Sequence, residues 1–383
     1  MADVFVPFCD LSVQWREIRD EVLPELERLF EASAFCLGPW VEAFERSFAA
    51  YLGVPHVVAV NSGTSAVHLA LLAMGIGPGD EVLVPSHTFV GSVWGVLYAG
   101  ARPVLCDVDR ETGTLDAADA ARRIGPKTRA IVAVHLYGQA ADMEAIRALA
   151  TAHGLRIVED AAQSHGCRAA DGRLTGTIGD IAAFSFYPGK NLGAAGEAGA
   201  VVTADAEVAE RLRSLRNHAQ RERYRHAEVG FNYRMDGLQG LVLKAKLGRL
   251  DRWTRERRRI ASVYAAGLAD LPLELPRAVH GDHVYHLYVV RTPARDRLRA
   301  WLAGQGIETG LHYPVPLHRQ PFMTEVVGGG LRLPESERWA SHGLTLPLYY
   351  GMAPWQIELV IAGVRRFFEE AAEDGRAEVG RVA

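Results

Sequence analysis

The sequence has few cysteines, and their spacing indicates no disulfide bond or metal site. Four cysteines occur in 383 residues, and no two form a Cys-x-x-Cys motif. Isolated cysteines exclude a small disulfide-stapled fold and indicate free thiols in a reducing compartment. The histidines also lack a spacing such as His-Glu-x-x-His, so we expect no metal site. We expect buried free thiols at Cys9, Cys36, Cys106 and Cys167.

Long apolar runs and an excess of one charge are also missing. No run approaches the roughly 18 apolar residues needed to cross a bilayer. Residues 1–10 lack the basic and apolar segments of a signal peptide. The 42 basic and 46 acidic residues give a net charge of −4, which attracts neither nucleic acid nor an anionic membrane. We therefore expect a cytoplasmic protein without a nucleic-acid or membrane partner.

What the sequence does contain is an alternation of short apolar segments with helical patterns between about residues 56 and 205. Continuous apolar strands separated by helices indicate a mostly parallel sheet that is covered on both faces. The predicted fold class is α/β. The seven predicted strands are 56–60, 81–85, 102–108, 130–137, 155–160, 181–186 and 199–203, with helices at 65–74, 91–99 and 143–152.

The pattern changes after residue 235. A long, basic helix is predicted at about 237–268, with its basic residues on exposed positions, and it links two domains. A large domain, 1–240, includes an N-terminal helix at about 15–30. A smaller α+β domain, 241–383, follows. In the smaller domain we predict strands at 271–276 and 283–292, and helices at 295–305 and 355–371.

The strongest local signal is a lysine in a glycine-rich loop, Ser185-Phe-Tyr-Pro-Gly-Lys190-Asn-Leu-Gly-Ala-Ala-Gly-Glu-Ala-Gly199. Glycines let such a backbone bend around a flat, phosphorylated ligand. A partly desolvated lysine has a lowered pKa and can form an imine with a carbonyl ligand. Taken alone, the loop is also compatible with a solvated surface lysine.

A carboxylate ends the apolar segment Arg156-Ile-Val-Glu-Asp160, which places it at the edge of the sheet where α/β proteins bind ligands. There Asp160 can pair with a protonated pyridine nitrogen, as pyridoxal 5'-phosphate (PLP) chemistry requires. Gln163 can donate a hydrogen bond to the ring oxygen of the same cofactor. The alternative for Asp160 is a helix N-cap.

The segment Asn61-Ser-Gly63-Thr64-Ser65 turns from a strand into a helix. Free N–H groups at the start of a helix, together with hydroxyl groups, bind phosphate. Simple capping by Ser62 or Thr64 is the alternative. After the next strand, Phe89 can stack on a ring or belong to the core. All four signals follow separate strands, so they can converge on one edge of the sheet.

These segments resemble the DegT/DnrJ/EryC1/StrS family of sugar aminotransferases. The resemblance rests on NSGTSAVHLAL, PSHTF, VEDAAQSHG, SFYPGKNLGAAGEAG and GFNYRMDGLQG, and it extends from about residue 7 to 368. It implies PLP fold type I, a homodimer with a shared active site, and amino transfer from L-glutamate to a nucleotide-linked keto-sugar. The segment from His218 to Asn232 weakly favours carbon 3 of the sugar.

The resemblance also implies roles for individual residues. Lys190 matches the lysine that holds PLP as a Schiff base, and Asp160 and Gln163 match the partners of the ring. Phe89 matches the stacking position. Gly63, Thr64, Ser65 and Ser185 match the phosphate site, and Asn232 matches an asparagine that reaches the neighbouring subunit's phosphate. His312, Tyr313 and His318 match a segment near the substrate.

Ala198 and the basic segment 211–225 need separate comment within this family resemblance. Ala198 replaces a glycine that the family usually has, and the added methyl group narrows a turn without removing activity. The basic helix predicted at 211–225 is either a solvated face or a site for the substrate's diphosphate. Two other functions remain as alternatives. A related PLP sugar dehydratase carries histidine in place of Lys190, and some relatives were regarded as PLP-binding regulators without turnover.

Overall fold

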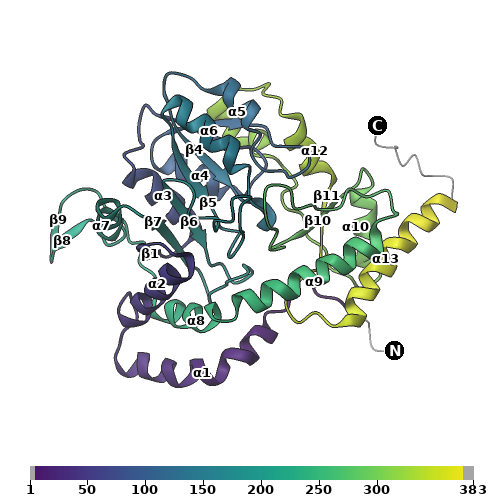
Figure 1. Ribbon diagram of the computed structural model, residues 1–383, viewed down its shortest axis with the longest axis horizontal. Coiled ribbons are helices and arrows are strands. Elements are labelled where there is room, and N and C mark those ends of the chain that lie inside the picture. Colours follow the sequence, from purple (N-terminus) through teal and green to yellow (C-terminus); the bar gives the residue numbers. More distant parts are fainter. Residues whose placement is uncertain (1–4, 374–383) are drawn as a thin grey trace.

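A seven-stranded sheet forms the centre of the protein in the computed structural model, which describes residues 5–373 (Figure 1). The order is β1-β7-β6-β5-β4-β2-β3, and β7 runs antiparallel to both neighbours while the other pairs are parallel. The seven predicted strands are confirmed, with small differences at their ends. They are β1 (His56–Val60), β2 (Glu81–Pro85), β3 (Arg102–Cys106), β4 (Thr128–Val134), β5 (Arg156–Asp160), β6 (Ile181–Ser185) and β7 (Gly199–Thr203).

Helices cover both faces of this sheet, which is why its strands are apolar throughout rather than alternating. In β1, Val58 and Val60 pack into one hydrophobic cluster, while Val57 and Ala59 pack into another. The first face carries α3 (Gly63–Ala73), α4 (Gly91–Tyr98) and α7 (Ala206–Leu215). The second face carries α2 (Pro39–Leu52), α5 (Ala117–Arg123), α6 (Met143–His153) and α8 (Gly237–Leu247). The sequence analysis had not predicted α2.

The N-terminal helix α1 (Ser12–Glu31) packs against α8 through Ile18 and Val22. The C-terminal part has its own hydrophobic core, which includes Tyr264, Leu298 and Val360. Its elements are α9 (Leu250–Leu268), β10 (Tyr288–Arg291), α10 (Arg295–Gly304), α11 (Pro321–Val327), α12 (Pro334–His342), β11 (Gly343–Leu346) and α13 (Pro354–Glu373). Figure 1 shows α9, α10, α13, β10 and β11 at the right of the view, to one side of the sheet.

Three predictions need correction. The single helix at 237–268 is two helices, because α8 ends at Leu247 and the chain passes through Gly248 before α9 begins. The strand at 271–276 is absent except for one bridge from Glu274 to Arg291, because the prolines at 272 and 276 have no N–H for a ladder. The strand at 283–292 is shortened to β10.

The basic segment 211–225 is not one helix. α7 ends at Leu215, and a small hairpin of β8 (Gln220–Glu222) and β9 (Arg225–His226) follows. In Figure 1 this hairpin projects from the side of the molecule near α7. The cysteines also differ from expectation, since Cys106 and Cys167 are buried but Cys36 is exposed and Cys9 half-buried. Across residues 5–373, no helix is both long enough and apolar enough to cross a membrane.

Candidate active site

A cavity of about 800 Å³ lies where the carboxyl ends of the parallel strands meet the C-terminal part of the chain. Its walls come from the loops after β1, β2, β5 and β6, and from α9 and the segment that follows β11. Ligands in α/β proteins bind at this edge of the sheet because the loops that follow the strands converge there. Nine of the twelve candidate residues line it: Gly63, Thr64, Phe89, Asp160, Gln163, Ser185, Lys190, His312 and Tyr313.

Lys190 lies in the loop after β6, where its backbone N–H donates to the carbonyl of Tyr187 at 2.8 Å. Burial lowers the pKa of its ammonium group to about 8, and the nearby carboxylate of Asp160 opposes that shift. A larger fraction of this amine is therefore neutral near pH 7 than for an exposed lysine. Lys190 is half-buried in the wall of the cavity rather than solvated on the outer surface, an environment that suits a nucleophile.

Asp160 is buried at the end of β5 and is held from two sides. Its carboxylate accepts a hydrogen bond from the hydroxyl of Ser92 at 2.7 Å and from the backbone N–H of Ala162 at 3.2 Å. No helix begins in the segment 161–180, so Asp160 is not a helix N-cap. A buried carboxylate near a cavity and a lysine is suited to bind a cationic ring nitrogen.

The start of α3 comes close to the end of β6. A Cβ atom on Gly63 would lie 2.5 Å from Cβ of Ser185, so only glycine permits this approach. Ser62 is the N-cap and accepts from the backbone N–H of Ser65 at 3.1 Å. Thr64 and Ser185 line the cavity, whereas Ser65 is buried beside Ser62 and does not. The helix start and two hydroxyl groups thus bring hydrogen-bond donors to the cavity, an arrangement suited to an anion.

Gln163, Tyr313 and Phe89 contact one another in the wall of the cavity. The amide of Gln163 accepts from the backbone N–H of Tyr137 at 2.6 Å and donates to the Tyr313 hydroxyl at 3.0 Å. The ring of Tyr313 lies 5.7 Å from that of Phe89. Phe89 is 49% exposed, so it is not a core residue and its ring is available to a ligand.

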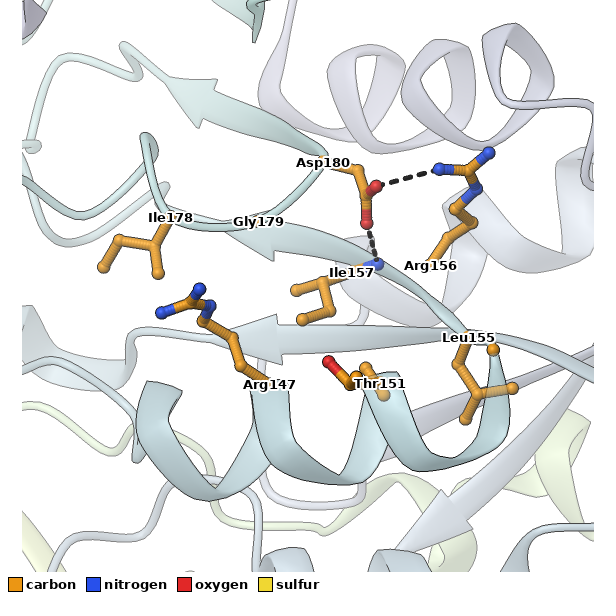
Figure 2. Close-up of a pocket in the computed structure, with 10 residues that line it drawn as sticks. Arg147, Thr151, Leu155, Arg156, Ile157, Ile178, Gly179 and Asp180 are labelled. Atoms are coloured by element: carbon orange, nitrogen blue, oxygen red, sulfur yellow. Dashed lines mark hydrogen bonds and ion pairs between the residues drawn. The ribbon is translucent and has the colours of Figure 1, made fainter.

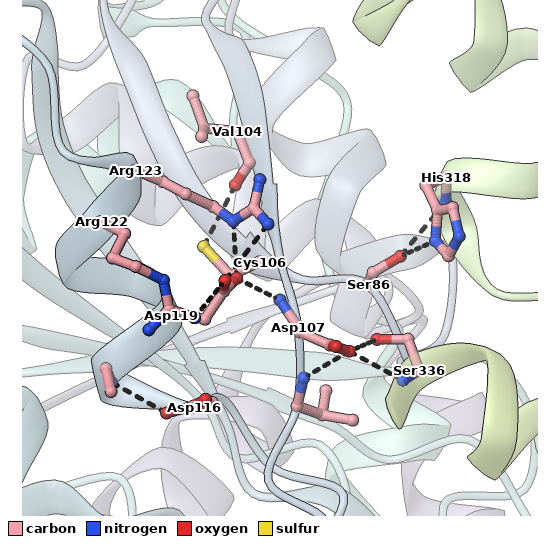
Figure 3. Close-up of polar contacts among 12 residues, drawn as sticks. Ser86, Val104, Cys106, Asp107, Asp116, Asp119, Arg122, Arg123, His318 and Ser336 are labelled. Atoms are coloured by element: carbon pink, nitrogen blue, oxygen red, sulfur yellow. Dashed lines mark hydrogen bonds and ion pairs between the residues drawn. The ribbon is translucent and has the colours of Figure 1, made fainter. Parts of the chain in front are cut away.

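Of the two candidate histidines, only His312 lines the cavity. His312 bonds to the hydroxyl of Thr345 at 2.7 Å, and has its pKa lowered to about 4 by burial and by Lys190. Figure 3 shows His318 held by Ser86, while Asp107 nearby holds Ser336 at the start of α12. His318 also bonds to Glu337 at 3.0 Å, so its visible contacts are structural.

Asn232 lies outside the cavity of its own chain. It is exposed, and its side chain accepts from Arg234 at 3.0 Å. The basic segment before it is also away from the cavity: Arg211, Arg213 and Arg225 pair with glutamates on the surface. The described side chains of this segment therefore contribute nothing to the cavity of their own subunit.

Two other hollows lie beside α6, away from this cavity. Figure 2 shows one of about 460 Å³ between α6 and the start of β5, with Arg147 and Thr151 on the helix. There Asp180 already bonds to Arg156 and to the backbone N–H of Ile157. A neighbouring hollow of about 700 Å³ shares Arg147. Neither hollow brings a buried lysine close to a buried carboxylate. Residues 5–373 contain no cluster of three or more side chains that could bind a metal ion.

Sequence reasoning missed several residues of the cavity, among them Ser92, Arg257 and His286. Ser92 follows Phe89 by three positions, at the start of a helix whose first turn faces the cavity, and that spacing was a usable signal. Arg257 was assigned to an exposed basic face, yet it is 3% exposed. No local pattern separates it from its basic neighbours.

Comparison with known proteins agrees with this geometry. The model of the DegT/DnrJ/EryC1/StrS aminotransferase family matches residues 16–365. The dTDP-3-amino-3,4,6-trideoxy-alpha-D-glucose transaminase of Streptomyces venezuelae is 47% identical and covers 95% of this chain and 96% of its own. A UDP-N-acetyl-3-dehydro-alpha-D-glucosamine 3-aminotransferase of Acidithiobacillus ferrooxidans is 41% identical, covering 94% and 97%. A pleiotropic regulatory protein of Geobacillus stearothermophilus is 40% identical, covering 96% and 100%.

Solved structures give the same result. The structure of S. venezuelae DesV in complex with a ketimine intermediate superposes with a TM-score of 0.92 at 47% identity, covering 95% of this chain and 99% of that one. The structure of NtdA from Bacillus subtilis with bound cofactor PMP gives a TM-score of 0.89 at 32% identity, covering 95% and 85%. The same fold therefore extends over nearly the whole of this chain.

Proposed function

From the premise that the chain belongs to the DegT/DnrJ/EryC1/StrS aminotransferase family, we propose that it transfers the amino group of L-glutamate to carbon 3 of a nucleotide-linked keto-sugar. It is a PLP-dependent sugar aminotransferase. One observation carries the assignment of the site: the structure brings Lys190, with its lowered pKa, and the buried Asp160 together in one cavity.

The residues present fit PLP. Because Gly63 has no side chain, the start of α3 lies close to Ser185, in a space that an added Cβ would occupy. Backbone N–H groups there, with Thr64 and Ser185, would hold the phosphate. Asp160 would hold the ring nitrogen, Phe89 would stack on the ring, and Lys190 would bind it covalently. When bound, PLP supplies an electron sink that stabilises negative charge on the reacting carbon.

The chain's own residues then have defined tasks. The amine Nζ of Lys190 takes the proton from the amino-bearing carbon of the donor, and later returns a proton to the sugar carbon that receives the amino group. Its lowered pKa leaves enough neutral amine to act as a base near pH 8. Ser92 and Ala162 fix the carboxylate of Asp160 at the end of β5, so its charge stays where the ring nitrogen requires it.

The cavity size and the relatives support the sugar substrate. A volume of about 800 Å³ is within the range of cavities that bind drug-sized ligands, and it must hold PLP as well as a substrate. The names of the S. venezuelae and A. ferrooxidans relatives both place the amino group on carbon 3 of a nucleotide-linked sugar. These names favour carbon 3 over carbon 4 for this chain.

The G. stearothermophilus relative favours one other function, a regulator without turnover. Against it, the cavity keeps a lysine beside a carboxylate, which a pure regulator does not need. Lys190 likewise argues against the related sugar dehydratase, in which histidine replaces that lysine.

A half-reaction separates these functions. The PLP-loaded protein is mixed with L-glutamate alone, and we expect the absorption of the pyridoxal form to give way to that of the pyridoxamine form, with one 2-oxoglutarate released per site. Addition of nucleotide-linked 3-keto- and 4-keto-sugars then identifies the acceptor by restoring the first spectrum. Absence of any spectral change with a panel of amino donors would contradict the proposal.

A further inference from the structure

Arg257 is a buried cation without a carboxylate partner. Four arginines of residues 5–373 are buried, and three pair with acids: Arg216 with Glu45, Arg291 with Glu274 and Arg295 with Asp296. Within the same residues, no carboxylate lies within 4.0 Å of the Arg257 guanidinium. A buried charge without a counter-ion is costly, so its retention needs an explanation.

The hydrogen bonds of Arg257 account for only part of its guanidinium. One terminal nitrogen, Nη1, donates to the carbonyls of Tyr285 at 3.1 Å and of Leu348 at 2.9 Å. Those bonds fix the side chain in place. Nε and Nη2 have no hydrogen-bond acceptor among the residues that the structure describes. Two donors of a planar fork are thus left for a ligand.

This guanidinium belongs to the cavity that contains Lys190. His286 lines the same cavity, and its pKa, which burial lowers, is lowered further by Lys190 and Arg257. The imidazole of His286 is therefore neutral and does not compete with Arg257 for an anion. Burial lowers the pKa of Arg257 to about 10, so it stays protonated at neutral pH. An anion that reaches the Arg257 guanidinium gains a favourable charge interaction.

We propose that Arg257 binds a carboxylate group of the amino donor. This inference rests on the function proposed above and adds the residue that selects an amino-acid donor. A guanidinium fork and a carboxylate match in geometry and form charge-assisted hydrogen bonds. Arg257 is 3% exposed, whereas Phe89 at the same cavity is 49% exposed. A small carboxylate suits so enclosed a site better than the diphosphate of a nucleotide.

The test compares Arg257→Lys and Arg257→Gln with the matched control Arg295→Gln. Arg295 is also buried and also donates to two backbone carbonyls, of Ala340 and Gly343, but it does not line the cavity. The rate of the spectral change is measured against L-glutamate concentration. We expect kcat/KM for glutamate to fall about ten- to a hundredfold in both Arg257 variants. The affinity for PLP and kcat/KM for the keto-sugar should stay near wild type.

A second measurement, made on the wild-type enzyme, tests the proposal without relying on the folding of a variant. In the wild-type enzyme, glutarate should compete with L-glutamate, whereas propylamine, which has no carboxylate, should not. Glutarate inhibition should weaken in Arg257→Lys, whose melting temperature is recorded alongside. The proposal is overturned if glutarate does not compete, or if the Arg257 variants use glutamate as well as the control does. A wild-type enzyme that does not respond to glutamate at all would instead overturn the proposed donor.

Discussion

At the scale of single residues, the environment of Lys190 predicts how its reactivity depends on pH. Only the neutral amine attacks a carbonyl, and the pKa of this amine is lowered to about 8. Covalent attachment of PLP to the cofactor-free protein should therefore speed up as pH rises toward 8 and level off above it. Stopped-flow absorbance from pH 6 to 10 measures this profile, with borohydride reduction to locate the lysine.

Lys190→Ala is the control, and in this variant borohydride should fix no PLP to the chain. A loop lysine contributes little packing, so the variant should stay folded. A profile that is centred near pH 10, or reduction at another lysine, would show that Lys190 is not the attachment site.

Asp160 makes a second prediction at this scale. Asp160→Asn keeps the shape and the acceptor oxygen for Ser92 but removes the charge that would keep the ring nitrogen protonated. We expect kcat to fall about a hundred- to a thousandfold, the usual loss when one preorganised electrostatic contact is removed. PLP should still bind, as its absorbance would show. A near-normal rate would mean that the carboxylate only orders the turn through Ala162.

At the scale of elements, the contact between α3 and β6 determines the proposed phosphate site. In Gly63→Ala the new Cβ would meet Ser185 at 2.5 Å, so the helix start must move away from the strand. We expect weaker PLP binding and a stability loss of about 1–3 kcal/mol. Equilibrium dialysis with PLP and thermal unfolding measure the two effects.

Gly304→Ala is the matched control, since Gly304 lies at the end of α10 and an added Cβ there meets nothing within 4 Å. It should leave both quantities near wild type. If Gly63→Ala binds PLP as tightly as this control does, the start of α3 does not hold the phosphate.

At the scale of the whole molecule, the position of Asn232 bears on the proposed homodimer. Asn232 is exposed and lies outside the cavity of its own chain, as expected for a residue that completes the neighbouring subunit's site. A two-fold axis would make this exchange reciprocal. Lys190→Ala and an inactive Asn232 variant, refolded together in equal amounts, should regain about a quarter of wild-type activity, because half of the dimers are mixed.

Each variant refolded alone provides the baseline for this experiment, and mass measurement confirms that mixed dimers have formed. Activity that stays at the baseline in such dimers would place both residues in one subunit's site.

The sequence by itself determined the sheet and the main chemistry. Strands that are apolar throughout leave little choice but a mostly parallel sheet covered on both faces, and the residues that end its parallel strands must meet at one edge. Lys190, Asp160 and Thr64 were predictable as residues of this edge for that reason, since each ends a strand or lies in the segment that follows one.

Only the tertiary structure decided which of the candidate side chains line the cavity and which do not. Ser65 and His318 follow the same local patterns as their neighbours, yet they face other hydrogen-bond partners. Arg257 lies in a run of arginines, and its burial depends on where α9 meets the segment around Leu348, far away in sequence. Such contacts join residues that no local periodicity relates, so the folded chain alone could show them.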